Sequence, residues 1–308
     1  MSDFWDREVI ERHHNEWMAL PAVREHINEL IGGEQPMWPI DWFESWLRGR
    51  TFRRALSVGC GSGALERDLL KRGLCDSIDA FDGSLMSLRL ARETAQRAGF
   101  GDRIRYFAAD FNQYVLPRSA YDIVFFHQSA HHIARLERFF TQVLRTLKRD
   151  GLVYLDEYVG PSRFEWSEDR MRTQQSFYTS LPRCARISDR LTLPVQEDDP
   201  SEAIRSSEIE PILSAGFDVL ARRPYGGMLL SLVIPSLRPK AIGEMLPYVI
   251  GCERSLIAAG VASFYAVIVA TPKTPKIFGI ARYASDRLRR RVKAELSAAA
   301  IAATATKM

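Results

Sequence analysis

The sequence has few of the features that mark an exported, membrane-bound or metal-cross-linked protein. It contains four cysteines in 308 residues, with no Cys-x-x-Cys pair and no clustered histidine partners, so neither a disulfide framework nor a zinc site is indicated. The first 17 residues are charged throughout and lack the apolar run of a signal peptide. The longest apolar region, 242–270, is broken by charged residues and a proline, so no transmembrane segment is expected. We therefore expect a cytoplasmic protein with reduced thiols.

The sequence also has no large excess of positive or negative charge. Lys and Arg number 42 against 38 Asp and Glu, a formal net charge of +4, so no nucleic-acid partner is expected. With 19 Gly, 15 Pro and 46% hydrophobic residues, the composition is that of a globular protein and excludes collagen-like and disordered chains. The length is about twice that of an ordinary single domain. These quantities leave the oligomeric state open.

From Phe52 onward, short apolar runs alternate with amphipathic helical patterns, which is typical of a parallel sheet covered by helices. We predict an α/β fold: a doubly wound seven-stranded sheet, mostly parallel with one antiparallel edge strand, plus a helical N-terminal layer and lid insertions. One helical stripe runs from Leu136 to Leu147, and the helix is expected to end at Gly151. The runs predicted as strands are 55–58, 77–81, 104–109, 121–126, 152–158, 217–223 and 264–270.

Composition divides the chain into five predicted segments. They are a helical N-terminal cap (1–50), a cofactor-binding core (51–160), a lid-like insertion (161–205), the remainder of the sheet with a helical insertion (206–272) and a basic C-terminal tail (273–308). The cap holds five of the six tryptophans, whose rings could pack on the core or wall a substrate pocket. The tail could be a solvated helix or be attracted to an anionic surface.

A glycine-rich loop, Gly59-Cys60-Gly61-Ser62-Gly63, follows the first predicted strand and leads into a helix. Glycines there let the backbone turn sharply and let a ligand approach closely. One interpretation is a dinucleotide fingerprint, Gly59-x-Gly61-x-x-Ala64, with a pyrophosphate on the helix N-terminus. Gly59-x-Gly61-x-Gly63 can also be the loop of another nucleoside cofactor, and the loop alone leaves both open. Cys60 is expected to be a small packing residue and not a nucleophile.

An acidic residue follows the second predicted strand. Asp82 lies 19 residues after Gly63 and just before Gly83, where a carboxylate can accept hydrogen bonds from both hydroxyls of a ribose. Asp79 is a competitor, but it falls inside the predicted strand. Asp82 could instead cap the helix that follows.

Three further motifs carry a family resemblance. Asp110 and Phe111 end the third strand, 121–133 holds the fourth strand and the loop after it, and 144–153 holds a helix, a turn and the fifth strand. Together with the glycine loop, these motifs resemble those of class I S-adenosylmethionine-dependent methyltransferases over about residues 52–158, and more loosely over 206–270. One difference from these enzymes is that Arg149-Asp150 occupies a position where Pro-Gly is commoner, and this difference affects only a turn. Residues 157–164 and 199–206 also resemble a group of bacterial methyltransferases.

The resemblance implies S-adenosylmethionine as the cofactor, and methyl transfer to an oxygen, nitrogen or carbon of a small-molecule acceptor. A cofactor-binding scaffold or regulator, and an NAD(P)-dependent oxidoreductase, remain as alternatives. No metal is expected, because the spacing of His127, His131 and His132 does not put three nitrogens on one face and no Cys or carboxylate nearby in sequence completes a tetrahedron. The residues expected to bind the cofactor are Gly59, Cys60, Gly61, Gly63, Asp82, Gly83, Asp110, Phe111, His127 and Gln128.

Two residues are predicted to lie nearest the transferred methyl. Glu157 ends the fifth predicted strand and His131 follows the fourth, and the carboxyl ends of parallel strands face one crevice. Either could take the proton of a hydroxyl or amine acceptor. The alternative is that His131 orders its loop and Glu157 pairs with an arginine of the insertion, such as Arg163.

Overall fold

The computed structural model describes residues 17–192, 199–273, 280, 283 and 287. In this part of the chain seven strands form one sheet in the order β3-β2-β1-β4-β5-β7-β6. β1 to β5 run parallel, and β7 runs antiparallel to β5 and to the edge strand β6, as the sequence predicts. The strands are β1 (Phe52–Val58), β2 (Cys75–Asp82), β3 (Ile104–Ala108), β4 (Tyr121–His127), β5 (Leu147–Tyr158), β6 (Phe217–Pro224) and β7 (Tyr265–Pro272).

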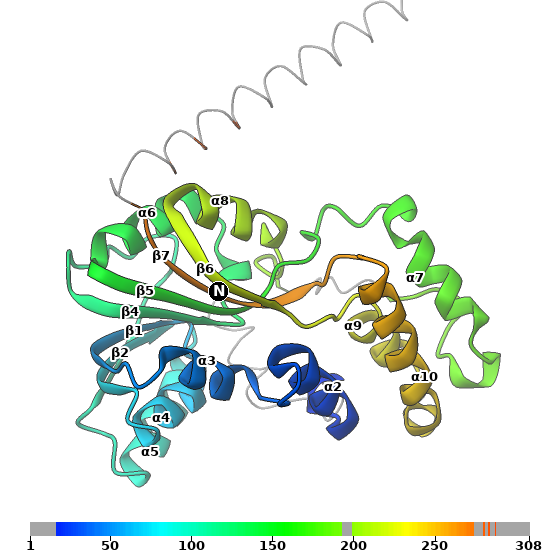
Figure 1. Cartoon of the computed structure of the whole chain (residues 1–308), viewed down its shortest axis with the longest axis horizontal. Helices are drawn as coiled ribbons and strands as arrows, with labels where there is room; N and C mark the ends of the chain where they lie inside the picture. Colours follow the sequence, from blue (N-terminus) through cyan, green and yellow to red (C-terminus); the bar gives the residue numbers. More distant parts are fainter. Residues whose placement is uncertain (1–16, 193–198, 274–279, 281–282, 284–286, 288–308) are drawn as a thin grey trace, which may run out of the picture.

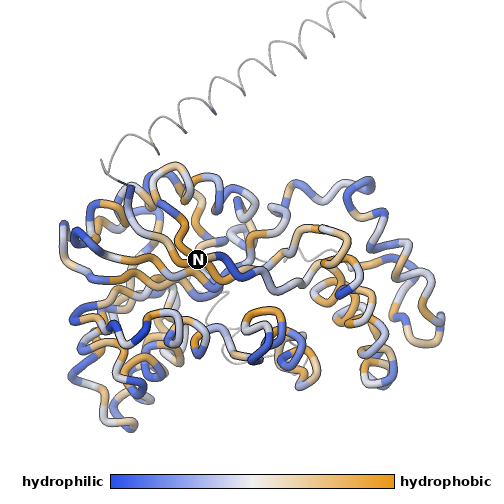
Figure 2. Tube along the Cα trace, viewed as in Figure 1, coloured by the Kyte–Doolittle hydropathy of each residue, from blue (hydrophilic) through white to orange (hydrophobic). Residues whose placement is uncertain are grey.

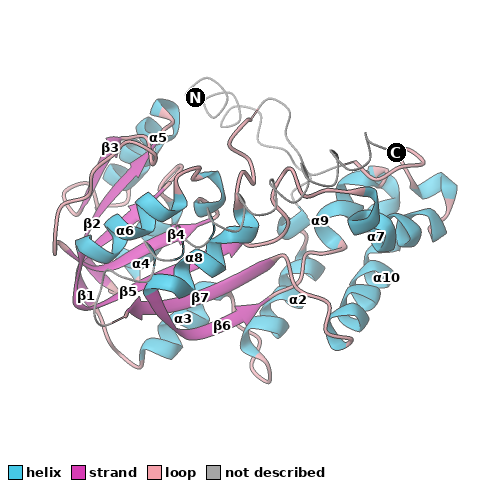
Figure 3. Ribbon diagram, turned by 90° about the horizontal axis from the view of Figure 1, so that it is seen from above, coloured by secondary structure: helices cyan, strands magenta, loops and turns pink. Residues whose placement is uncertain are grey.

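Helices cover both faces of this sheet. In Figure 1, α3, α4 and α5 lie against one face and α6 and α8 against the other, while α7, α9 and α10 group beyond one end of the strands; Figure 3 shows the same grouping from above. Within the described residues, no helix is long and apolar enough to cross a membrane. The helices are α2 (Pro21–Gly32), α3 (Pro39–Leu47), α4 (Ala64–Lys71), α5 (Leu85–Arg97), α6 (Leu136–Thr146), α7 (Glu168–Ser180), α8 (Ile209–Gly216), α9 (Leu230–Val233) and α10 (Pro239–Ala258).

The alternation of side chains along the strands builds two cores, one on each face. In β4, Ile123 and Phe125 pack on the α3 side, while Val124 and Phe126 pack on the α6 side. Both sets are fully buried, which is why this strand reads as a continuous apolar run instead of an alternating one. Figure 2 shows the apolar residues concentrated along the strands. The sheet is therefore a rigid platform whose carboxyl edge carries the loops described below.

One predicted boundary is wrong. The helical stripe includes Leu147, but α6 ends at Thr146, and Leu147 is the first residue of β5 and pairs with Tyr121. Leu147 keeps an extended backbone (φ −70°, ψ 136°) while its side chain still fills the same core as Phe140. Gly151 consequently lies within β5 and does not end the helix. The burial pattern alone could not reveal this change from helix to strand, since Leu147 would be buried in either element.

In the N-terminal segment α2 packs against β6, whereas the inserted α7 packs against α9 beyond the end of the strands (Figure 1). α2 buries Val23, Ile27 and Ile31 along one stripe, and the insertion contributes α7, where the Tyr178 hydroxyl donates to the carbonyl of Ser236 at 2.8 Å. The segment boundaries and the lid role stay predictions. The basic tail lies, apart from residues 273, 280, 283 and 287, outside the described residues.

Candidate active site

The glycine loop after β1 is held by backbone conformations that glycine adopts readily. Gly59 has φ +68° and Gly63 has φ +75°. A Cβ on Gly59 would lie 2.5 Å from the Cβ of Ser129. Gly61 also has a positive φ, of +51°, yet no heavy atom of the described residues lies within 4 Å of where its Cβ would be. The loop therefore borders open space at Gly61, on the side a ligand can reach.

Asp82 lies beside this loop as the last residue of β2. Its Oδ2 accepts a hydrogen bond from the Gly61 backbone N–H at 2.8 Å, and its Oδ1 accepts one from Ser84 N–H at 2.8 Å. The N-cap of α5 is Ser84, whose hydroxyl accepts from Ser87 N–H, so Asp82 is not the cap. The Asp82 carboxylate therefore lies directly beside the glycine loop.

The competitor, Asp79, has other partners inside β2. It accepts hydrogen bonds from Arg54 at 2.7 Å, from Arg105 at 2.8 Å and from the Tyr121 hydroxyl at 2.8 Å. Burial acts to raise the pKa of this carboxyl, but the hydrogen bonds from Arg105, Tyr121 and Arg54 outweigh it and hold the pKa below the usual value of 3.8. Asp79 is thus the centre of an ion-pair cluster within the sheet.

Beneath the loop lies an acid that the sequence analysis did not single out. Glu66, in the first turn of α4, is 1% exposed; its Oε1 accepts from the Ser57 hydroxyl, and its Oε2 has no hydrogen-bond partner among the described residues. Burial raises its pKa. Burial, with Glu66 and Asp82 nearby, also raises the pKa of the Cys60 thiol, which therefore stays protonated. An acid in the first turn of a helix is normally explained by a favourable interaction with the helix dipole. The position of Glu66 in the sequence therefore gave no reason to predict a site residue.

Phe111 and Asp110 lie at the end of β3. The Phe111 ring packs 5.7 Å from that of Phe81 and comes within 3.5 Å of the position that a Cβ on Gly59 would take. The Asp110 carboxylate accepts from the Asn112 backbone and orders its own turn. The structure thus brings Phe111 to the glycine loop.

At the end of β4, His127 and Gln128 meet residues from β5 and from the chain after β6. His127 Nε2 lies 3.6 Å from Asp156 Oδ2, and its side chain is 48% exposed. Gln128 has φ +51°, a left-handed conformation that costs a non-glycine residue about 1–2 kcal/mol. Its amide donates to the Tyr225 hydroxyl at 3.1 Å, and this hydroxyl donates to Asp156 at 2.6 Å. Such strained residues gather at functional sites. Asp156 and Tyr225 were not predicted from the sequence; the two consecutive carboxylates at the end of an apolar strand were the available signal.

The predicted meeting of His131 and Glu157 is present, in an unexpected arrangement. Glu157 is fully buried. Its Oε2 accepts from the backbone N–H groups of Ser129 at 2.8 Å and Ala130 at 2.6 Å, and its Oε1 accepts from Tyr158 N–H at 2.8 Å. The same Oε1 contacts Nδ1 of His131. Glu157 therefore lies behind His131 and exposes no atom to an acceptor.

A second histidine and a distant glutamate complete this cluster. His131 and His132 belong to the short 3-10 turn η2 (Ala130–His132), and the Nε2 of each lies 3.8 Å from Glu202 Oε2. Burial acts to lower the pKa of His131, but Glu157 and Glu202 outweigh it and raise this pKa to about 9. Burial and the neighbouring His131 lower the pKa of His132. No carboxylate nearby in sequence was expected to complete a site with these histidines, but the fold brings Glu202, about 70 residues further along the chain, to both of them.

Arg163 does not pair with Glu157. Its backbone N–H donates to the carbonyl of Ala203 at 2.8 Å, and its guanidinium donates to the carbonyl of Asp199 at 2.6 Å. The backbone N–H of Ile204 donates to the carbonyl of His131 at 3.2 Å. The segment that carries Glu202 is therefore fastened both to the start of the insertion and to the histidine turn.

The strand order, the glycine loop after β1 and the acid at the end of β2 together define an α/β protein with the class I methyltransferase fold. Residues 56–155 match the family described as a methyltransferase domain. This match covers about a third of the chain, and that region is similar to a methyltransferase domain.

Curated relatives match part of the chain. The sterol 24-C-methyltransferase of Yarrowia lipolytica is 26% identical over 119 residues, which cover 39% of this chain and 31% of that protein. The 27-O-demethylrifamycin SV methyltransferase of Amycolatopsis mediterranei is 24% identical over 173 residues, covering 52% and 57%. The chain thus spans about a third of the length of the sterol methyltransferases it matches. Among solved structures, a putative sarcosine dimethylglycine methyltransferase from Galdieria sulphuraria aligns with a TM-score of 0.49 at 14% identity, covering 87% of this chain and 98% of that one.

Proposed function

We propose that the chain transfers a methyl group from S-adenosylmethionine to an oxygen, nitrogen or carbon atom of a small-molecule acceptor. The observation that carries the proposal is the open space at Gly61 beside the Asp82 carboxylate, inside the region similar to a methyltransferase domain. The matched relatives are named for a sterol and for a demethylrifamycin, which supports an acceptor of the small-molecule class.

The residues around the loop fit the cofactor. Backbone at Gly59, Gly61 and Gly63 would cradle it, and Asp82 would accept from its ribose hydroxyls. The orphaned Glu66 Oε2 is an acceptor that a ligand amine can use. Gly83, Cys60, Asp110, Phe111, His127 and Gln128 complete the set proposed to surround the cofactor. When bound, the cofactor supplies a methyl that is already electrophilic, so the protein mainly positions the acceptor and excludes water.

On the acceptor side, we place the turn that carries His131 beside the acceptor, with Glu157 behind this turn as a positioning residue. The turn that carries His131 sits against the glycine loop, because the Ser129 hydroxyl donates to the carbonyl of Val58 at 2.6 Å. Glu157 holds both the backbone of this turn and the His131 ring. Glu157, at the end of β5, thus fixes the orientation of the His131 ring.

The cofactor assignment is tested by calorimetry on Asp82→Ala, with Asp76→Ala as the matched control at the exposed opposite end of the same strand. We expect Asp82→Ala to weaken S-adenosylmethionine binding about 10- to 100-fold, since it loses hydrogen bonds to a charged group, and Asp76→Ala to bind normally. Equal binding by the wild type and Asp82→Ala would refute the assignment.

The activity itself is tested by incubating the chain with methyl-labelled cofactor and a metabolite extract. Transfer of the label to a small molecule supports the proposal. Cofactor binding with no transfer to any component would favour a scaffold or regulator, and tighter binding of NADH would favour an oxidoreductase.

A further inference from the structure

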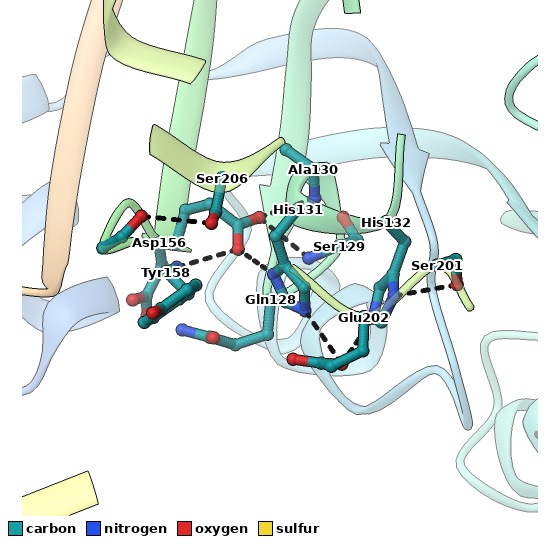
Figure 4. Close-up of polar contacts among 12 residues, drawn as sticks. Gln128, Ser129, Ala130, His131, His132, Asp156, Tyr158, Ser201, Glu202 and Ser206 are labelled. Atoms are coloured by element: carbon teal, nitrogen blue, oxygen red, sulfur yellow. Dashed lines mark hydrogen bonds and ion pairs between the residues drawn. The ribbon is translucent and has the colours of Figure 1, made fainter. Parts of the chain in front are cut away.

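The turn after β4 and the segment at 199–206 bring three ligand-type side chains to one point. The rings of His131 and His132 lie 4.1 Å apart between centroids, and in Figure 4 both are directed toward the Glu202 carboxylate. One nitrogen from each histidine and one Glu202 oxygen lie within 4.8 Å of one another. The side chains are 7%, 10% and 20% exposed, so the cluster is largely shielded from water.

The far nitrogen of each ring has its own acceptor. Nδ1 of His131 contacts Glu157, and Nδ1 of His132 lies 3.2 Å from the Ser201 hydroxyl and 3.5 Å from Asp199 Oδ2. Metal-binding histidines usually donate their other N–H to a carboxylate or similar acceptor, which fixes the ring and directs the lone pair at the ion. Both rings of this turn are held in that way, with Nε2 on the side of Glu202.

The glutamate reaches the cluster on a segment with fixed backbone contacts. Ile204 N–H donates to the carbonyl of His131, and the Asp199 carboxylate accepts from both the backbone and the hydroxyl of Ser201. The Ser206 hydroxyl donates to the carbonyl of Gly160 at 3.1 Å. Glu202 is therefore positioned by its surroundings before any ligand arrives, as a preorganised site requires.

We propose that His131, His132 and Glu202 bind a divalent first-row transition-metal ion through the two Nε2 atoms and one carboxylate oxygen. Two imidazoles and a carboxylate suit zinc, cobalt, nickel or iron. An ion about 2.1 Å from each ligand needs ligand atoms about 3.4 Å apart in tetrahedral geometry, against 3.8 Å from Glu202 to either histidine here. A shift of a few tenths of an ångström in the glutamate side chain brings its oxygen to that distance from each histidine, while the two histidine nitrogens lie within 4.8 Å of each other.

Three protein ligands leave at least one coordination position for water or another oxygen donor. Three carboxylates, of Glu157, Asp199 and Glu202, surround the two imidazoles, and this acidic environment favours a dication. The inference goes beyond the proposed function and does not depend on it, because metal binding can be measured without cofactor or acceptor.

The experiment titrates the full chain, stripped of metal by a chelator and dialysed, with Co²⁺ and with Zn²⁺. Visible absorption reports on the Co²⁺ environment and calorimetry measures the Zn²⁺ affinity. We expect one ion per wild-type chain with a cobalt spectrum typical of nitrogen and oxygen ligands, and a loss of affinity of at least about 100-fold in His132→Ala and Glu202→Gln. His127→Ala, which removes a histidine of the same loop that faces Asp156 instead, should bind as the wild type does.

Absence of saturable Co²⁺ uptake by the wild type, or equal uptake by Glu202→Gln, would overturn the site. Glu202 is partly exposed, so Glu202→Gln keeps the test valid if His132→Ala fails to fold, which circular dichroism checks. Methyl transfer by a chain that binds no metal would remove this inference and leave the proposed function. Metal binding by a chain that does not bind S-adenosylmethionine would support the metal site and refute the proposed function.

Discussion

Replacement of Glu157 by glutamine separates the positioning of His131 from the general stability of the fold. The carboxylate accepts three backbone N–H groups and contacts the His131 ring. If the glutamine oxygen keeps the Ser129 and Ala130 bonds, its NH₂ group faces Tyr158 N–H and His131 Nδ1. Each orphaned buried polar group costs about 1–3 kcal/mol, so the loss of these two partners should lower the free energy of unfolding by about 2–6 kcal/mol, out of the roughly 5–15 kcal/mol typical of a domain.

The matched control is Glu253→Gln. Glu253 is also fully buried and accepts three backbone N–H groups, those of Gly227, Leu229 and Leu230, but it lies in α10. Urea unfolding followed by tryptophan fluorescence should show comparable losses for both variants. Methyl transfer by the folded protein should fall only in Glu157→Gln. A stability loss below about 1 kcal/mol in Glu157→Gln, less than a single orphaned donor costs, would refute the reasoning, and so would an equal loss of transfer in Glu253→Gln.

Two further predictions follow from the burial of titratable groups. The Asp79 pKa is lower in the folded protein than its usual 3.8, so this carboxylate stabilises the fold above that pH and the contribution is lost as the pH falls through the folded-state pKa; the urea midpoints of the wild type and Asp79→Asn should differ at pH 7 and converge in acid, and a constant difference would contradict this. Burial raises the pKa of the Cys60 thiol, whereas Cys184 is exposed, so iodoacetamide at pH 8 should alkylate Cys184 first, as peptide mass spectrometry would detect; early labelling of Cys60 would show that its thiolate is accessible.

Local patterns predicted the order and type of most elements. The apolar runs that became β1, β2, β4 and β5 are buried on both faces of the sheet, and such burial determines a run of apolar residues in the sequence. The glycine loop could be predicted for a similar reason, since a backbone with positive φ at Gly59 and Gly63 restricts the residue type. The boundary between α6 and β5 at Leu147 could not be predicted from such a pattern, because the Leu147 side chain is buried whether its backbone is helical or extended.

The surroundings of the predicted site residues were decided by the tertiary structure. Asp82 and Asp79 are both acids of the second strand, and only the register places one beside Gly61 and the other among arginines. Glu157 appears in sequence as a carboxylate at a strand end, yet the turn after β4 folds over it and surrounds it with N–H donors.

The sequence by itself therefore determined the strands, the glycine loop and the resemblance to methyltransferases, because short local patterns carry each of them. Only the tertiary structure decided that Glu202 lies 3.8 Å from both His131 and His132. That contact joins the turn after β4 to a segment about 70 residues further along the chain. No periodicity or spacing encodes such a contact, since it arises when the insertion closes back onto the carboxyl edge of the sheet.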